Sequence, residues 1–288
     1  MPGLRAYHVR SEGSAGSRLT TPVAPGYIDR PSATFYCMHW SRTSLLILAG
    51  LTNTASSDAE SVAVAVAANF HAPMEALVQD FETRFNHDVT LISGSTGGLY
   101  AQIVNGAPYD VFIAADTKRP ALLATSGRGV ARSQFTVAIG QLVLWSADRE
   151  LIDGQDLSLL QDSRIRFLAI ANPDLAPYGE AARQALVALD LWESWASRLA
   201  YGENIAQAYA MVSTGNAELG LIARSQVSAE TGAGGYLSVP QAMYEPIRQD
   251  AILLERGAGN AAATALLTFL STPEAKTIIR SFGYRVTE

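Results

Sequence analysis

Residues 62–70 read Val-Ala-Val-Ala-Val-Ala-Ala-Asn-Phe, an apolar run that ends on a side-chain amide. Small and β-branched residues without alternating polar positions are typical of a strand buried on both faces. Apolar residues at helical spacing follow from Met74 to Phe85, and Pro73 lies in the first turn, where a helix tolerates proline. We therefore predict a buried strand that leads into a helix capped by Asn69.

The same order of strand and helix recurs along the chain. Residues 89–93 and 110–115 are expected strands in the first half, and residues 167–171 and 218–223 are expected strands in the second half. Short apolar strands that alternate with helices predict parallel sheets with helices on both faces, and ligands of such sheets bind where strands end and helices begin. Four helix starts follow strand-like runs: residues 68–70, 94–97, 176–179 and 203–205.

Two β-rich stretches, residues 135–145 and 244–254, contain no helical pattern. We interpret them as crossings between two lobes, so that the chain enters a second lobe and returns. The predicted fold class is α/β, with two mixed, mostly parallel sheets joined by two hinge strands. Residues 57–138 and 248–288 are expected in lobe 1, and residues 139–247 in lobe 2. Final helices are expected from about Ala261 to Leu270 and from Pro273 onward.

The bulk composition predicts an ordered, acidic protein. Of the 288 residues, 48% are apolar and 17% are charged, which suffices for a core, and the net charge is −6. The five arginines of residues 1–56 outweigh Glu12 and Asp29 by three charges, so residues 57–288 carry a net charge of −9. This balance argues against a nucleic-acid partner, because phosphate backbones require basic patches.

The N-terminal residues have the order of a secretory signal peptide. Arg42 precedes the apolar run 45–51, and small residues follow it at 54–57. The run is too short to cross a bilayer. We expect residues 1–56 to form a disordered extension plus signal peptide, with Met38 as the true start. The single cysteine, Cys37, precedes the run, so we expect neither disulfides nor a lipid anchor in the exported chain.

The four helix starts share a chemical property. Each helix start presents unpaired backbone N–H groups and a partial positive charge, which suits an anion. None of the four contains an arginine or a lysine. The sequence therefore predicts a pocket for a small oxyanion held by neutral donors.

Several blocks of the chain follow one another in a characteristic order: residues 67–70, 93–103, 105–116, 170–173, 176–179, 203–208 and 282–284. Together these blocks resemble the periplasmic molybdate-binding proteins of ABC transporters. The resemblance covers roughly residues 61–286 in matching order, and it implies the two-lobed fold of type II solute-binding proteins. It also implies molybdate or tungstate as the ligand, delivery to a membrane permease, and a periplasmic location.

The resemblance also implies the residues that would hold the anion. They are Ala68, Asn69, Ser95, Thr96, Tyr178 and Ile205. The position before Asn69 is often serine or threonine in the family and is Ala68 here, so that hydroxyl contact is lost. Some members have a tyrosine where this chain has Ala223, and Tyr178 would supply the phenol from a different loop. The metal would be held only as the oxyanion, with no other cofactor.

Two alternatives differ in ligand or in class. The same fold could bind another small oxyanion such as sulfate, although an organic carboxylate site would usually show an arginine. An exported serine hydrolase could use Ser95, but a nucleophilic serine needs a partnered base, and the exported chain offers only His71 and His87. We therefore expect a monomeric binding protein and not an enzyme. Asp116 is expected to cap a helix, and Trp192 and Trp195 to serve packing.

Overall fold

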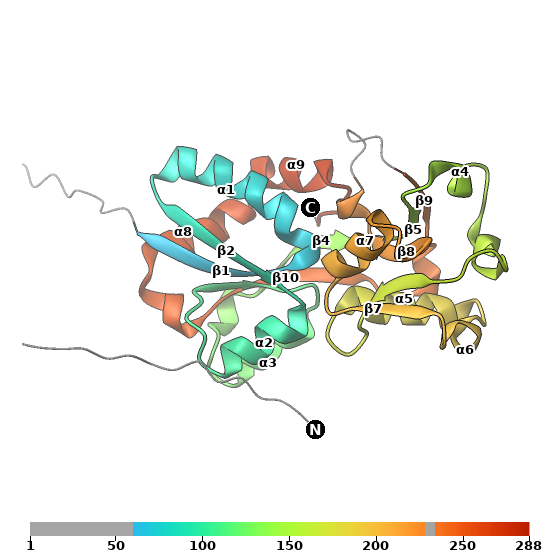
Figure 1. Cartoon of the computed structure of the whole chain (residues 1–288). Helices are drawn as coiled ribbons and strands as arrows, with labels where there is room; N and C mark the ends of the chain where they lie inside the picture. The colour runs from blue at the N-terminus through green and yellow to red at the C-terminus, as the bar shows by residue number, and fades with distance from the viewer. Residues whose placement is uncertain (1–59, 228–233, 288) are drawn as a thin grey trace, which may run out of the picture. The chain divides into compact units, whose positions relative to one another are not determined.

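Two five-stranded sheets organise the computed structural model, which describes residues 60–227 and 234–287 (Figure 1). In the first sheet, β1 is parallel to both of its neighbours, β2 and β3, whereas β10 is antiparallel to β3 and β4. The strands lie in the order β2 (Asp88–Gly94), β1 (Ser61–Ala67), β3 (Val111–Ile113), β10 (Ile247–Leu253) and β4 (Phe135–Gly140).

The second sheet has the same plan. Strand β6 is parallel to β7 and β8, whereas β5 is antiparallel to β8 and β9. The strand order is β7 (Leu199–Gly202), β6 (Leu168–Ala171), β8 (Leu219–Ala223), β5 (Leu142–Ser146) and β9 (Gly235–Ser238). The predicted α/β class with two mixed sheets is therefore confirmed. We call each sheet with its helices a lobe, the first built on β1 and the second on β6.

The chain passes between the two sheets twice. It leaves the first sheet at Gln141, the residue between β4 and β5, and it returns where β10 begins at Ile247. The two long β-rich stretches are thus the crossings that we predicted. The lobe boundaries at residues 138 and 248 remain predictions. The predicted signal peptide, Met38 and Cys37 lie outside the described residues.

Alternation along β1 explains how the first sheet is covered. Val62, Val64 and Val66 pack into one core cluster, and Ala65 packs into another on the opposite face. The first cluster contains side chains of α1 (His71–Phe85), α8 (Ala261–Leu270) and α9 (Pro273–Ser281). The second contains side chains of α2 (Thr96–Val104) and α3 (Lys118–Thr125). Helices therefore cover both faces, and the bounds predicted for the last two helices are confirmed.

The second lobe is built around one large apolar cluster. Its helices are α4 (Arg149–Ile152), α5 (Pro177–Ala188), α6 (Trp192–Trp195) and α7 (Ile205–Ser213). Trp195 is fully buried and its Nε1 donates to the carbonyl of Leu160 at 3.1 Å, which confirms its packing role. Short 3-10 turns complete the two lobes: η2 (Ala131–Ser133), η3 (Leu157–Gln161), η4 (Arg224–Gln226), η5 (Gln241–Met243) and η6 (Glu255–Gly259).

The junction after β1 differs from the sequence prediction. A 3-10 turn, η1 (Ala68–Phe70), separates β1 from α1, and α1 begins at His71 with Phe70 in the capping position. The expectation that Asn69 caps the helix is therefore wrong. Pro73 does lie in the first turn of α1, as predicted.

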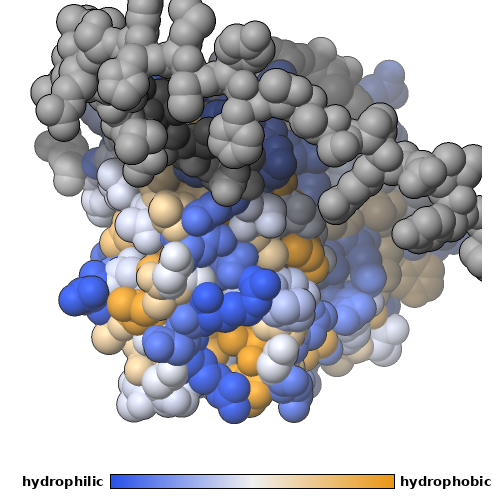
Figure 2. All heavy atoms as spheres, turned by 90° about the vertical axis from the view of Figure 1, so that its left-hand side faces the viewer, coloured by the Kyte–Doolittle hydropathy of each residue, from blue (hydrophilic) through white to orange (hydrophobic). Residues whose placement is uncertain are grey.

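The visible surface of the first lobe is mixed in polarity. Figure 2 shows hydrophilic side chains in blue interspersed with small apolar areas in orange. Large exposed apolar side chains occur singly in this lobe, such as Phe85 and Leu122. None of the helices in the described part of the chain has the length and apolar character to cross a bilayer.

A buried carboxylate ties β1 to β3. Oδ2 of Asp110 accepts from the backbone N–H of Ala63 at 2.8 Å, and Oδ1 pairs with Arg256. The Asp110 side chain is 5% exposed and the Arg256 side chain 55%. We expect Asp110→Ala to lower the free energy of unfolding by about 2 kcal/mol, because it leaves the partly buried N–H of Ala63 without an acceptor and removes the pair with the half-exposed Arg256.

Asp110→Asn keeps an oxygen for Ala63 and should cost less. Urea denaturation of both variants measures the difference. Equal losses would show that the pair with Arg256, and not the bond to Ala63, matters most.

Candidate functional site

All four helix starts meet at one small cavity between the two lobes. The space open to the centre of a water-sized sphere is about 10 Å³, roughly what one water molecule requires by the same measure. This small size favours a small ligand over a sugar or a peptide. It is lined by Ala67, Ala68, Asn69, Gly94, Ser95, Thr96, Ala115, Ala176, Pro177, Tyr178, Asn204 and Ile205. All six residues proposed from the sequence are in this lining, and none of the twelve lining residues is charged.

Two hydroxyl groups in the wall are oriented by backbone donors. Ser95 is the N-cap of α2, and its Oγ accepts from the N–H of Gly98 at 3.2 Å. Oγ1 of Thr96 accepts from the N–H of Ala115 at 3.0 Å. Because each oxygen already accepts a hydrogen bond, each hydroxyl keeps its own proton for another acceptor. Both side chains are buried.

Backbone N–H groups add further donors. Thr96, Tyr178 and Ile205 lie in the first turns of α2, α5 and α7, where an N–H has no acceptor within its own helix. No other acceptor for these three groups lies within hydrogen-bonding distance in the part of the chain that the structure describes. Asn204 caps α7, because its Oδ1 accepts from the N–H groups of Ala206 and Gln207, and the N–H of Ile205 is not used by this cap.

Tyr178 contributes a buried neutral phenol. Its hydroxyl lies close to that of Tyr284, but among the described residues it has no partner in hydrogen-bonding geometry. Burial, and then the neighbouring phenol of Tyr284, raise the pKa of Tyr178 well above the ordinary value of 10.0. The phenol therefore keeps its proton at neutral pH and can act as a donor.

The side chain of Asn69 is already engaged in hydrogen bonds. Its Nδ2 donates to Oε1 of Gln249 and to the hydroxyl of Tyr284, both at 2.8 Å. Gln249 in turn donates from Nε2 to the carbonyl of Ile247 at 3.3 Å, which orients its amide with the oxygen toward Asn69. Both N–H groups of the Asn69 amide are thus used within the protein, and they hold η1 in place.

Hydrogen bonds join the two lobes beside the cavity. Oγ of Ser225, in η4 of the second lobe, donates to the carbonyl of Asn69 at 2.9 Å and lies 3.0 Å from the Tyr284 hydroxyl. The N–H of Gly97 donates to the carbonyl of Leu175 at 2.8 Å. A Cβ at Gly97 would lie 2.9 Å from that carbonyl oxygen, so the approach requires glycine. The lobes are therefore in direct contact around the cavity.

The sequence analysis missed three residues of this region. Gln249, Ser225 and Tyr284 received no role in the site, although Tyr284 lay in a block of the resemblance. Gln249 is fully buried in β10, but it lies between Arg248 and Asp250, so its neighbours in the sequence give no sign of that burial. Ser225 follows the buried strand β8, so the rule applied to the other strand ends would have included it.

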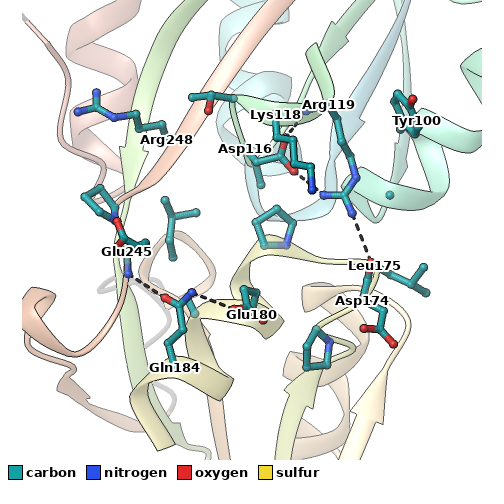
Figure 3. A pocket seen from close by; sticks show the side chains of 18 of the residues that line it. Tyr100, Asp116, Lys118, Arg119, Asp174, Leu175, Glu180, Gln184, Glu245 and Arg248 are labelled. Atoms are coloured by element: carbon teal, nitrogen blue, oxygen red, sulfur yellow. Dashed lines mark hydrogen bonds and ion pairs between the residues drawn. The ribbon is translucent and has the colours of Figure 1, made fainter. Parts of the chain in front are cut away.

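A larger groove of about 720 Å³ opens next to the cavity, between residues of both lobes. Figure 3 shows its charged side chains: Asp116 pairs with Arg119, which also donates to the carbonyl of Asp174 at 3.3 Å. Gln184 connects Glu180 to the N–H of Glu245. The lining holds four carboxylates and also three cations, Lys118, Arg119 and Arg248, so its charges largely offset one another. The uncharged cavity, where helix starts and hydroxyls converge, is the better candidate site for a small anion.

The remaining sequence expectations concern Asp116 and the histidines. Asp116 accepts from the N–H of Arg119 at 2.8 Å, which confirms a capping role at α3. Nδ1 of His71 lies 3.5 Å from Glu75. Within the described residues, neither His71 nor His87 forms a hydrogen bond with Ser95, and no group of three acidic, cysteine or histidine side chains could hold a metal ion.

The chain matches known proteins over most of its length. Residues 62–285 match the model of a family described as bacterial extracellular solute-binding protein. The molybdate-binding protein ModA of Azotobacter vinelandii is 48% identical over 247 residues, which cover 85% of this chain and 97% of that protein. The protein of the same name from Rhodobacter capsulatus is 44% identical over 246 residues, which cover 85% of this chain and 95% of that protein.

A solved structure agrees with these matches. The structure of an Azotobacter vinelandii periplasmic molybdate-binding protein has a TM-score of 0.76 at 38% sequence identity, and the match covers 79% of this chain and 100% of that chain.

The buried phenol of Tyr284 should make the stability of the fold depend on pH in the alkaline range. Burial raises its pKa from 10.0 to about 12. The phenol therefore stabilises the fold fully below pH 10, and this contribution is lost as the pH rises from 10 toward 12, where the unfolded chain ionises first. Relative to Tyr284→Phe, the free energy of unfolding of the unaltered chain should fall by about 1–2 kcal/mol between about pH 9 and pH 11. Chemical denaturation at both pH values tests this, and parallel behaviour of the two proteins would contradict it.

Proposed function

Because the chain belongs to the family of bacterial extracellular solute-binding proteins, we propose that it captures molybdate between its lobes and delivers it to the permease of an ABC transporter. The family resemblance found in the sequence is thereby confirmed. Two relatives, which match this chain over 97% and 95% of their own length, are named molybdate-binding proteins. Their names support molybdate as the ligand.

The observation that carries the proposal is the uncharged wall of donors around the cavity. Hydroxyls of Ser95, Thr96 and Tyr178 stand beside backbone N–H groups in the first turns of helices. Hydrogen bonds from neutral donors to a charged acceptor contribute about 1.5–3 kcal/mol each. Several of them can hold a doubly charged oxyanion tightly without a buried lysine or arginine, which would make release difficult.

The same wall favours a fully ionised anion. The hydroxyl oxygens of Ser95 and Thr96 already accept backbone hydrogen bonds. A partly protonated phosphate would bring an O–H group without a good acceptor, at a cost of about 1–3 kcal/mol. Molybdate and tungstate carry no such proton at neutral pH, so both fit the proposed site.

Each predicted site residue has a distinct proposed role. Ser95, Thr96 and Tyr178 donate from side chains, and Ile205 donates only from its backbone. Ala68 lacks a hydroxyl and contributes backbone alone. The engaged amide of Asn69 supports the site by holding η1, so its contact with the anion would come from its N–H.

The proposal extends to location and class. We propose a monomeric, periplasmic binding protein without catalytic activity or a separate cofactor, exported by its N-terminal signal peptide. The family description and the periplasmic relative support the location. The placement of His71 beside Glu75, away from any bond to Ser95 in the described residues, supports binding over hydrolysis.

Sulfate is the second candidate ligand, because it is also tetrahedral and fully ionised at neutral pH. Calorimetric titration of the purified chain with molybdate, tungstate and sulfate separates the candidates. We expect tight binding of molybdate and tungstate and at least about a hundredfold weaker binding of sulfate, a difference of roughly 3 kcal/mol that cavity size must supply. Equal affinity for sulfate would overturn the molybdate assignment.

Substitutions in the cavity wall test the residue roles. Tyr178→Phe removes one donor to a charged acceptor and should weaken molybdate binding by about 10- to 100-fold. Asn69→Ala should also weaken it, because it releases Gln249 from η1 and removes one of the two hydrogen bonds between Asn69 and Tyr284. Ile205→Val leaves the backbone donor intact and should have no effect. The exposed Tyr201→Phe is the matched control for loss of a phenol. Unchanged affinity in both Tyr178→Phe and Asn69→Ala would place the ligand elsewhere.

A further inference from the structure

Gly140, the last residue of β4, lies against the phenol of Tyr178. A Cβ on Gly140 would lie 2.0 Å from the Tyr178 hydroxyl oxygen and 2.9 Å from Cζ of the same ring. Both distances are shorter than real Cβ contacts. The hydroxyl of a second-lobe residue therefore occupies the space that any side chain at this position of the first sheet would need.

The backbone at Gly140 does not itself require glycine. Its φ is not among the positive values found at other glycines, such as Gly106 and Gly127. It pairs with Ile247 in the antiparallel ladder of β4 and β10, and the irregularity of that ladder lies farther along, between Gln249 and Asp250. Glycine inside a strand weakens it and commonly marks a close approach of another group. The close approach at Gly140 is that of Tyr178.

The same position borders the Asn69 network. A Cβ on Gly140 would lie 3.2 Å from Nε2 of Gln249, whose Oε1 accepts from Asn69. The next residue, Gln141, is where the chain crosses to the second sheet. Gly140 thus contacts groups that hold cavity residues of both lobes, at the crossing about which the lobes would move.

We infer that Gly140 is a positioning residue for the ligand: its missing side chain lets the Tyr178 hydroxyl of the second lobe settle against the first sheet, beside the cavity that Ser95 and Thr96 also line. This inference rests on the proposed function, because the donors that it aligns are those proposed for molybdate. A methyl group at position 140 pushes the phenol away and disturbs Gln249, so the donor set is no longer convergent.

A double-mutant cycle tests the inference. Gly140→Ala is made in the unaltered chain and in Tyr178→Phe, and molybdate affinity is measured by calorimetry. We expect Gly140→Ala to weaken binding by about tenfold or more in the unaltered chain, and by far less in Tyr178→Phe, where the clashing oxygen is absent. Gly259→Ala is the matched control, because Gly259 has no positive φ and no atom near its Cβ position, and it should bind as the unaltered chain does.

Urea unfolding of the same four proteins without ligand provides a second measurement. Gly140→Ala should destabilise the unaltered chain more than it destabilises Tyr178→Phe. If Gly140→Ala alone fails to fold and the double variant folds, that result would also support the inference. Equal effects of Gly140→Ala in both backgrounds, in affinity and in unfolding, would overturn the inference. If the unaltered chain bound no molybdate, the proposed function would fail, and the unfolding cycle would still decide whether Gly140 makes room for Tyr178.

Discussion

The hydrogen bonds of the Asn69 amide hold together segments that are far apart in the chain. They connect the end of β1 with Gln249 of β10 and with Tyr284 near the C-terminus, and the Asn69 carbonyl receives Ser225 from the second lobe. A buried amide must find partners, so these segments are constrained to one arrangement. The cavity depends on this arrangement, because η1 forms one of its walls and the contact with Ser225 is one of the hydrogen bonds that join the lobes beside it.

The second constraint is electrical neutrality. The described surface carries many charges, and the adjoining groove brings carboxylates close to the cavity, yet the cavity lining itself has none. Attraction for an anion must then come from oriented N–H and O–H groups, whose strength depends on geometry. Glycines at the points of closest approach, Gly97 and Gly140, allow that geometry, because a Cβ at either position would meet the opposite lobe.

The α/β class, the two β-rich crossings and the last helices were predictable because their apolar patterns are local. The helix starts that contain Ser95, Thr96, Tyr178 and Ile205 were visible in the same way, whereas the assignment of these residues to an anion came from the family resemblance and stays a prediction. The prediction that Asn69 caps α1 was wrong. It was inferred from residue type alone, whereas the Asn69 amide donates to a distant glutamine and a distant tyrosine.

The sequence by itself determined which segments become strands and helices, and hence that several helix starts with neutral donors lie at strand ends. Only the tertiary structure decided which polar groups face one another. Gln249, Ser225 and Tyr284 are separated from Asn69 by more than 150 positions, and no periodicity links them. The role of Gly140 was likewise decided only by the tertiary structure. Its backbone conformation is ordinary, and glycine is needed there because the Tyr178 phenol occupies the space of a side chain.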